Sequence, residues 1–91
     1  MVDEVTLLQH LIQLPSVSPM GKEMPEKSAI LGESRVTQFL AEWAREQGVA
    51  VIRQIVKPGR ENVVIVLPGE VQATVLWEVH QDTVPVDGMT I

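Results

Sequence analysis

The residues best suited to chemistry are a histidine and an aspartate two positions apart, His80 and Asp82. They follow residues 74–79, an apolar run whose β-branched and aromatic side chains favour a strand. Side chains alternate along a strand, so Glu78, His80 and Asp82 are expected on one side of it. Zinc binds the neutral imidazole well when a carboxylate holds the other ring nitrogen, because this fixes the tautomer and raises the ligand's basicity. The spacing therefore predicts a metal-ligating histidine oriented by an aspartate.

Blander interpretations of the same residues exist. His80 can be a structural histidine at a strand end, hydrogen-bonded to Asp82 or to the backbone. Glu78 suits either a surface carboxylate or a contact behind the metal ligand. A Ser-His-Asp triad is a poor alternative, because neither Ser16 nor Ser18 lies in a Gly-x-Ser-x-Gly elbow. Both serines are typical of turns and caps.

A longer string carries a family resemblance. Residues 78–85 read Glu-Val-His-Gln-Asp-Thr-Val-Pro. This resembles the metal-binding signature Gly-His-x-Asp-Thr-Val-Pro of the zinc amidohydrolase family that includes acetylornithine deacetylase, succinyl-diaminopimelate desuccinylase, aminoacylase and carboxypeptidase G. A Leu-Ile-x-Leu-Pro-Ser-Val-Ser-Pro segment from Leu11 to Pro19 adds to the resemblance, which covers nearly the whole chain. One departure is Val79, where the family most often has glycine.

The resemblance implies amide hydrolysis at a two-zinc site, with cobalt able to replace zinc. His80 would be the metal ligand, and Asp82, counted among the catalytic residues, would hold it. The bridging carboxylate and the general-base glutamate of the family follow later in its sequence. Residues 1–91 are therefore expected to be the amino-terminal fragment of a metallohydrolase catalytic domain, inactive alone. The implied substrate is an N-acyl amino acid or small peptide, and the intact family member carries a further domain through which a homodimer can form.

Composition bounds the class of protein. The chain has 91 residues, a formal net charge of −5, seven basic residues scattered singly and no cysteine. Nucleic-acid binding is not expected, because phosphate contact needs a basic patch. A thiolate metal site is excluded. The start is acidic and no run approaches the ~18 apolar residues of a membrane helix, so we expect a cytoplasmic protein without membrane contact.

Two helices are expected first. Apolar residues at helical spacing predict a helix over residues 3–13, which Pro15 ends. His10 lies away from its apolar stripe and is expected in solvent. Residues 16–27 read as an irregular loop. A second helix begins between Glu26 and Glu33 and ends at Gly48. Its predicted core face comprises Val36, Phe39, Leu40, Trp43 and Ala44.

Three strands are expected next, over residues 49–56, 62–67 and 75–79, the first two joined by a turn at 57–61. The second is almost continuously apolar, so both its faces should be covered. The order of elements predicts an α/β fold in which helices pack on a mixed sheet.

Two further hypotheses stay open. The chain could be a non-catalytic α/β interaction module that shares the fold, or a single-metal-binding domain. Sequence beyond Ile91 would separate them, because by resemblance the enzyme requires its remaining acidic ligands there.

Overall fold

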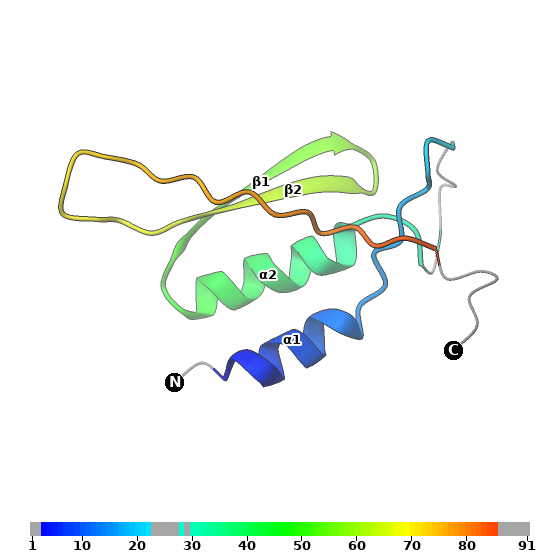
Figure 1. Cartoon of the computed structure of the whole chain (residues 1–91), viewed down its shortest axis with the longest axis horizontal. Coiled ribbons are helices and arrows are strands. Elements are labelled where there is room, and N and C mark those ends of the chain that lie inside the picture. Colours follow the sequence, from blue (N-terminus) through cyan, green and yellow to red (C-terminus); the bar gives the residue numbers. More distant parts are fainter. Residues whose placement is uncertain (1–2, 23–27, 29, 86–91) are drawn as a thin grey trace.

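Two helices precede a β-hairpin in the computed structural model, which describes residues 3–22, 28 and 30–85. The elements are α1 (Glu4–Ile12), α2 (Ser34–Glu46), β1 (Ala50–Lys57) and β2 (Arg60–Val66). The hairpin lies against α2, and α1 lies on the far side of α2 (Figure 1). The expected α/β class is confirmed at this level. The prediction of a mixed sheet was wrong, because within the described ranges the sheet has two strands and they are antiparallel.

The hairpin turns more tightly than its sequence predicted. β1 ends at Lys57 and β2 begins at Arg60, so residues 58–59 alone make the connection. Gly59 has φ of 77°, a conformation that glycine adopts without steric cost. Across the strands, the Arg53 guanidinium lies 2.6 Å from a carboxylate oxygen of Glu61. The predicted hairpin is thus confirmed, with the turn three residues shorter than the five-residue segment expected.

The small core lies between α2 and the hairpin. Val36, Ala41 and Ala44 are its buried apolar residues, and Thr37 of the same helix has no exposed surface. Alanine and threonine allow a close approach of helix to strands. Phe39, Leu40 and Trp43, predicted as core with Val36 and Ala44, are only half-buried. Phe39 and Trp43 line the open groove between α2 and α1, which leaves them partly uncovered.

The first helix forms as predicted but buries none of its residues. Asp3 caps it by accepting hydrogen bonds from the amide of Val5 at 3.0 Å and the hydroxyl of Thr6 at 2.6 Å. The apolar stripe points outward, leaving Val5 65%, Leu8 55% and Ile12 73% exposed. On the side toward α2, an open groove of about 510 Å³ separates the helices. There the ring of His10, exposed as expected, meets Phe39 edge-on, with centroids 5.9 Å apart.

Loop segments are tied to the start of α2. Arg35 donates hydrogen bonds to the backbone oxygens of Pro15, Ser28 and Leu31. Val17 forms parallel bridges with both Leu31 and Thr83. The irregular loop expected over residues 16–27 is present over 16–22, and residues 23–27 lie outside the described part of the chain. No helix in that described part is long and apolar enough to cross a membrane.

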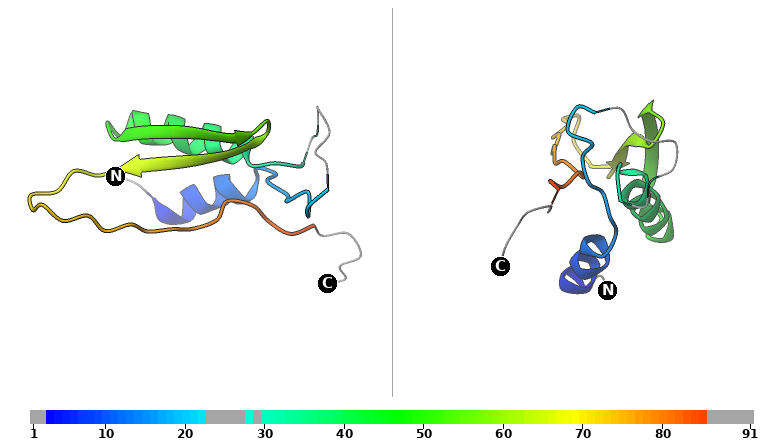
Figure 2. Two further views of the ribbon diagram at one scale, coloured as in Figure 1. Left: turned by 90° about the horizontal axis from the view of Figure 1, so that it is seen from above. Right: turned by 90° about the vertical axis from the view of Figure 1, so that its right-hand side faces the viewer.

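Residues 75–79, expected as a third strand, do not form a hydrogen-bonded strand in the structure. Among described residues, no backbone hydrogen bond joins residues 67–80 to the hairpin, and this stretch runs past it as an unpaired extended chain (Figure 2). Its apolar side chains are exposed, including Trp77 at 86% and Val79 at 88%. The second strand is also uncovered in part, with Ile65 37% and Val66 44% exposed, so the expectation of two covered faces was wrong. A strand needs a hydrogen-bonding neighbour, and β-propensity by itself does not supply one.

Candidate metal-ligating site

The structure brings His80 and Asp82 together. The Nδ1 atom of His80 lies 3.2 Å from the Oδ1 of Asp82 and 2.8 Å from the backbone oxygen of the same residue. Both oxygens accept, so Nδ1 is the nitrogen that carries the proton and donates to them. The other nitrogen, Nε2, then has its lone pair available on a side chain that is 85% exposed. This arrangement is typical of metal-ligating histidines.

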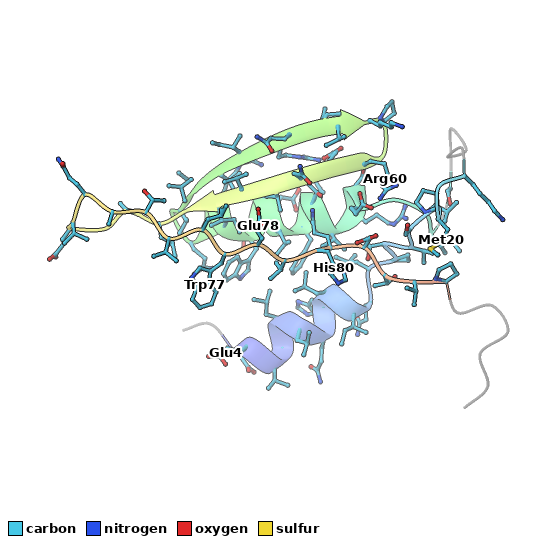
Figure 3. All side chains as sticks on the ribbon, turned by 45° about the horizontal axis from the view of Figure 1, so that its top comes forward. Glu4, Met20, Arg60, Trp77, Glu78 and His80 are labelled. Carbon is cyan, nitrogen blue, oxygen red and sulfur yellow. The ribbon has the colours of Figure 1, made fainter. Side chains whose placement is uncertain are left out.

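Glu78, predicted on the same side, takes no part in this contact. Within residues 3–22, 28 and 30–85, no hydrogen bond or ion pair joins it to His80, and it is exposed. Glu78 and Trp77 do lie on opposite sides of the extended chain (Figure 3), as strand alternation predicts. Val79 has no positive φ, since Met20 is the one non-glycine residue with such an angle in the described chain. The backbone before the histidine is therefore ordinary, and valine fits where the family has glycine.

The donor set fits one ligand position of a zinc site and does not complete the site. A neutral imidazole with a carboxylate on its second nitrogen is a standard zinc ligand. No group of three or more histidine, cysteine, aspartate or glutamate side chains is gathered to hold a metal within the described ranges. Catalytic zinc usually takes three protein ligands, and the pair offers one imidazole nitrogen toward such a set.

A partly buried hydrogen-bond network holds the segment that carries the pair. The Gln81 side chain donates from Nε2 to the backbone oxygen of Glu61 at 3.1 Å and accepts at Oε1 from the hydroxyl of Thr37 at 3.2 Å. The Gln81 backbone oxygen accepts from the Ser16 hydroxyl at 2.9 Å. Ser16 and Thr37 are buried, at 3% and 0% exposure. Ser16 is thus a structural serine that joins distant segments, where the sequence indicated only a turn.

Sequence reasoning missed Gln81, although one signal was available. It is a polar residue on the alternate, inward side between two site residues, where an apolar side chain would be expected. A polar group that becomes half-buried in such a place needs a partner, so it points to a specific anchor. Thr37 carried no comparable signal, because the contact joins residues 44 positions apart.

The positive charge of Arg60 also lies near the pair of His80 and Asp82. The sequence did not indicate this proximity. Arg60 donates from Nε to both carboxylate oxygens of Glu33, at 2.7 and 2.9 Å. This hydrogen bond raises the pKa of the Arg60 guanidinium above its ordinary value, against the opposing effect of desolvation. The negative charges of Glu33 and, to a smaller extent, Asp82 raise the pKa further. Arg60 begins β2 and Glu33 precedes α2, so the hairpin turn brings them to the same end of the molecule as Asp82.

Comparison of the chain with protein-family models, with curated proteins and with solved structures found no match. Membership of the zinc amidohydrolase family therefore stays a hypothesis that depends on the sequence motif.

Proposed function

We propose that this chain is the amino-terminal part of a zinc-dependent amidohydrolase catalytic domain, of deacylase or exopeptidase type. The substrate class proposed is an N-acyl amino acid or a small peptide. The observation that supports it best is the contact of His80 with Asp82, placed inside a string that resembles the family's metal-binding signature. The two-helix and hairpin arrangement is compatible with an α/β catalytic domain and does not by itself select this family.

In this proposal each residue of the pair has a separate role. His80 binds zinc through Nε2, because Nδ1 is engaged with Asp82. Asp82 accepts the Nδ1 proton, which holds the ring in the tautomer that leaves Nε2 unprotonated. A zinc ion held there would supply Lewis acidity toward an amide carbonyl. The remaining ligands and the general base belong to the rest of the domain.

The exposed surfaces agree with a chain that packs against more protein. The stripe of α1 and residues 71–79 expose many large apolar side chains, among them Val5, Ile12, Val75, Leu76 and Trp77. Isolated apolar residues are normal on a surface, but a contiguous run of them marks an interface. The same observation favours the second candidate function, a non-catalytic interaction module, so metal content and turnover have to separate the two.

The test uses the complete protein encoded by the reading frame that contains this chain. Zinc per polypeptide is measured by elemental analysis, and hydrolysis is measured on a panel of N-acetyl amino acids and dipeptides. His80→Ala should lose most of the activity and part of the bound zinc. His10→Ala is the matched control, because His10 lies on α1 against Phe39 and should leave both quantities unchanged.

Two outcomes would contradict the proposal. Equal zinc content and turnover in His80→Ala and His10→Ala would exclude His80 as a ligand. A wild-type protein that binds no zinc and hydrolyses nothing in the panel would favour the interaction module instead.

A further inference from the structure

Gln81 connects the candidate site to the rest of the fold. Side chains alternate along an extended chain, so Gln81 points to the side opposite His80 and Asp82. Its amide bonds to two elements at once, the backbone oxygen of Glu61 in β2 and the hydroxyl of Thr37 in α2. The two hydrogen bonds of the Gln81 side chain therefore also determine the direction in which the neighbouring side chains of His80 and Asp82 point.

The chemistry of the two partners determines how the amide is oriented. The backbone oxygen of Glu61 can only accept a hydrogen bond, so the nitrogen of the Gln81 amide has to face it. The amide oxygen then faces the Thr37 hydroxyl, which lies 3.2 Å from it and 3.4 Å from the Glu61 backbone oxygen and donates over the shorter distance. Glutamate would place a carboxylate oxygen against the Glu61 carbonyl, and methionine would fill the space without bonding. Glutamine is the residue of this length that satisfies both partners.

Support from other parts of the chain is weak before Gln81 and strong after it. Residues 67–80 make no backbone hydrogen bond to the other described residues, and the His80 ring is hydrogen-bonded only to Asp82 among them. From Gln81 onward the chain is held by Ser16, and Thr83 exchanges backbone hydrogen bonds with residues 16 and 18 at 3.0 and 2.8 Å. Gln81 is thus the first anchored residue after an unsupported stretch.

We propose that Gln81 is a positioning residue for the metal-ligating pair: by joining α2 to β2 through its amide, it holds His80 and Asp82 facing each other. The inference rests on the proposed function for the role of the pair, although the orientation itself is independent of metal.

The test is the tautomer of His80 in the metal-free complete protein, measured by NMR with ¹⁵N-labelled histidine. The wild-type ring should show the Nδ1–H form, because Nδ1 donates to Asp82. In Gln81→Met this form should be lost toward the Nε2–H form that a solvated imidazole prefers. Gln54→Met is the matched control, since Gln54 is exposed on β1. Retention of the wild-type tautomer in Gln81→Met would overturn the proposal.

The signal of His10 reports whether a variant has kept its fold, because its ring lies against Phe39. If Gln81→Met alters the His10 signal too, variants of Thr37 take its place as the test. Thr37→Val removes the hydroxyl and should shift the His80 tautomer, whereas Thr37→Ser keeps the hydroxyl and should retain it. Identical tautomers in Thr37→Val and Thr37→Ser would then overturn the proposal.

Zinc affinity separates this inference from the proposed function. If His80 is a ligand, Gln81→Met should weaken zinc binding about 10-fold, as expected when the groups behind a ligand are disturbed. A tautomer shift in a protein that binds no zinc would support the positioning role and contradict the enzyme. A third outcome would contradict the positioning role alone. In it, His80→Ala loses zinc, whereas Gln81→Met keeps the wild-type His80 tautomer and the wild-type zinc affinity.

Discussion

One nitrogen of His80 faces two oxygens of Asp82: Nδ1 lies 2.8 Å from the backbone carbonyl and 3.2 Å from the carboxylate. A single N–H is shared between them. The carbonyl belongs to the backbone, so it stays in place whatever side chain residue 82 carries. The carbonyl supplies direction, and the carboxylate adds negative charge. The two contributions can be separated by mutation.

Asp82→Asn should weaken the site without releasing the ring. The amide removes the charge that makes the imidazole a stronger ligand, while the carbonyl still accepts the Nδ1 proton. Changes of this kind reduce metal affinity or activity by about 10–100-fold, and we expect the lower end, about 10-fold. Competition with a chelator measures the zinc affinity of the complete protein. Glu70→Gln, at an exposed position, serves as the control. If Asp82→Asn keeps full zinc affinity and full kcat, Asp82 is only a turn residue.

Features that depend on local signals could be predicted from the sequence. The first helix was expected over residues 3–13 from its apolar spacing and the following proline, and it spans Glu4–Ile12 with Asp3 as its cap. Gly48 was expected to end the second helix, and its φ of 75° is the left-handed conformation typical of that position. The contact of His80 with Asp82 could be anticipated too, since two residues on one side of an extended chain are neighbours.

Features that depend on distant partners could not be predicted from the sequence. The strand expected over residues 75–79 has the right composition but lacks a neighbour to pair with, and composition does not show which neighbours exist. Thr37 and Gln81 meet only because α2 packs on β2, an arrangement that no local pattern contains. α2 starts at Ser34, just past the expected range of 26–33, and the carboxylate of its cap residue Glu33 is bonded to Arg60 of β2 instead of to the helix.

The amino-terminal end of α1 should be sensitive to acid. The hydroxyl of Thr6, together with the amides of Thr6 and Val5, lowers the pKa of Asp3 from its ordinary 3.8. A lowered folded-state pKa stabilises the helix above pH 3.8, and this contribution is lost as the pH falls through the lower, folded-state pKa. Chemical shifts of Val5, followed from about pH 6 to well below pH 3.8, should therefore report progressive fraying at the acid end.

Variants at the cap identify the titrating group. Asp3→Asn keeps an oxygen acceptor without a charge, so its cap should not respond to pH in this range. Glu4→Gln leaves the cap intact and should keep the wild-type response. Equal responses in Asp3→Asn and wild type would assign the acid transition to another carboxylate.

Gly48→Ala should lower the free energy of unfolding by about 1 kcal/mol, because alanine disfavours the positive φ found there. Apart from its chain neighbours, no residue has an atom within 4 Å of the position that a Cβ at residue 48 would occupy, so backbone strain is the expected cost. Gly69→Ala is the matched control, since it also has open space around it but no positive φ. That variant should be neutral or slightly stabilising. Urea unfolding of the complete protein compares the two, and equal losses would show that strain at residue 48 is not the cause.

The 91-residue chain in isolation should neither hydrolyse amides nor bind zinc tightly, and it should self-associate. Tight binding requires three or four ligands, whereas the described residues gather no such group. Self-association follows from the unpaired backbone and exposed side chains of residues 71–79, which offer an open strand edge to a second copy. Size-exclusion chromatography with metal analysis measures both. Trp77→Lys with Val79→Lys should shift the chain toward monomer, and Val5→Lys on α1 tests whether the helix stripe contributes instead. A stable wild-type monomer that binds zinc with submicromolar affinity would show that the site is complete within these residues.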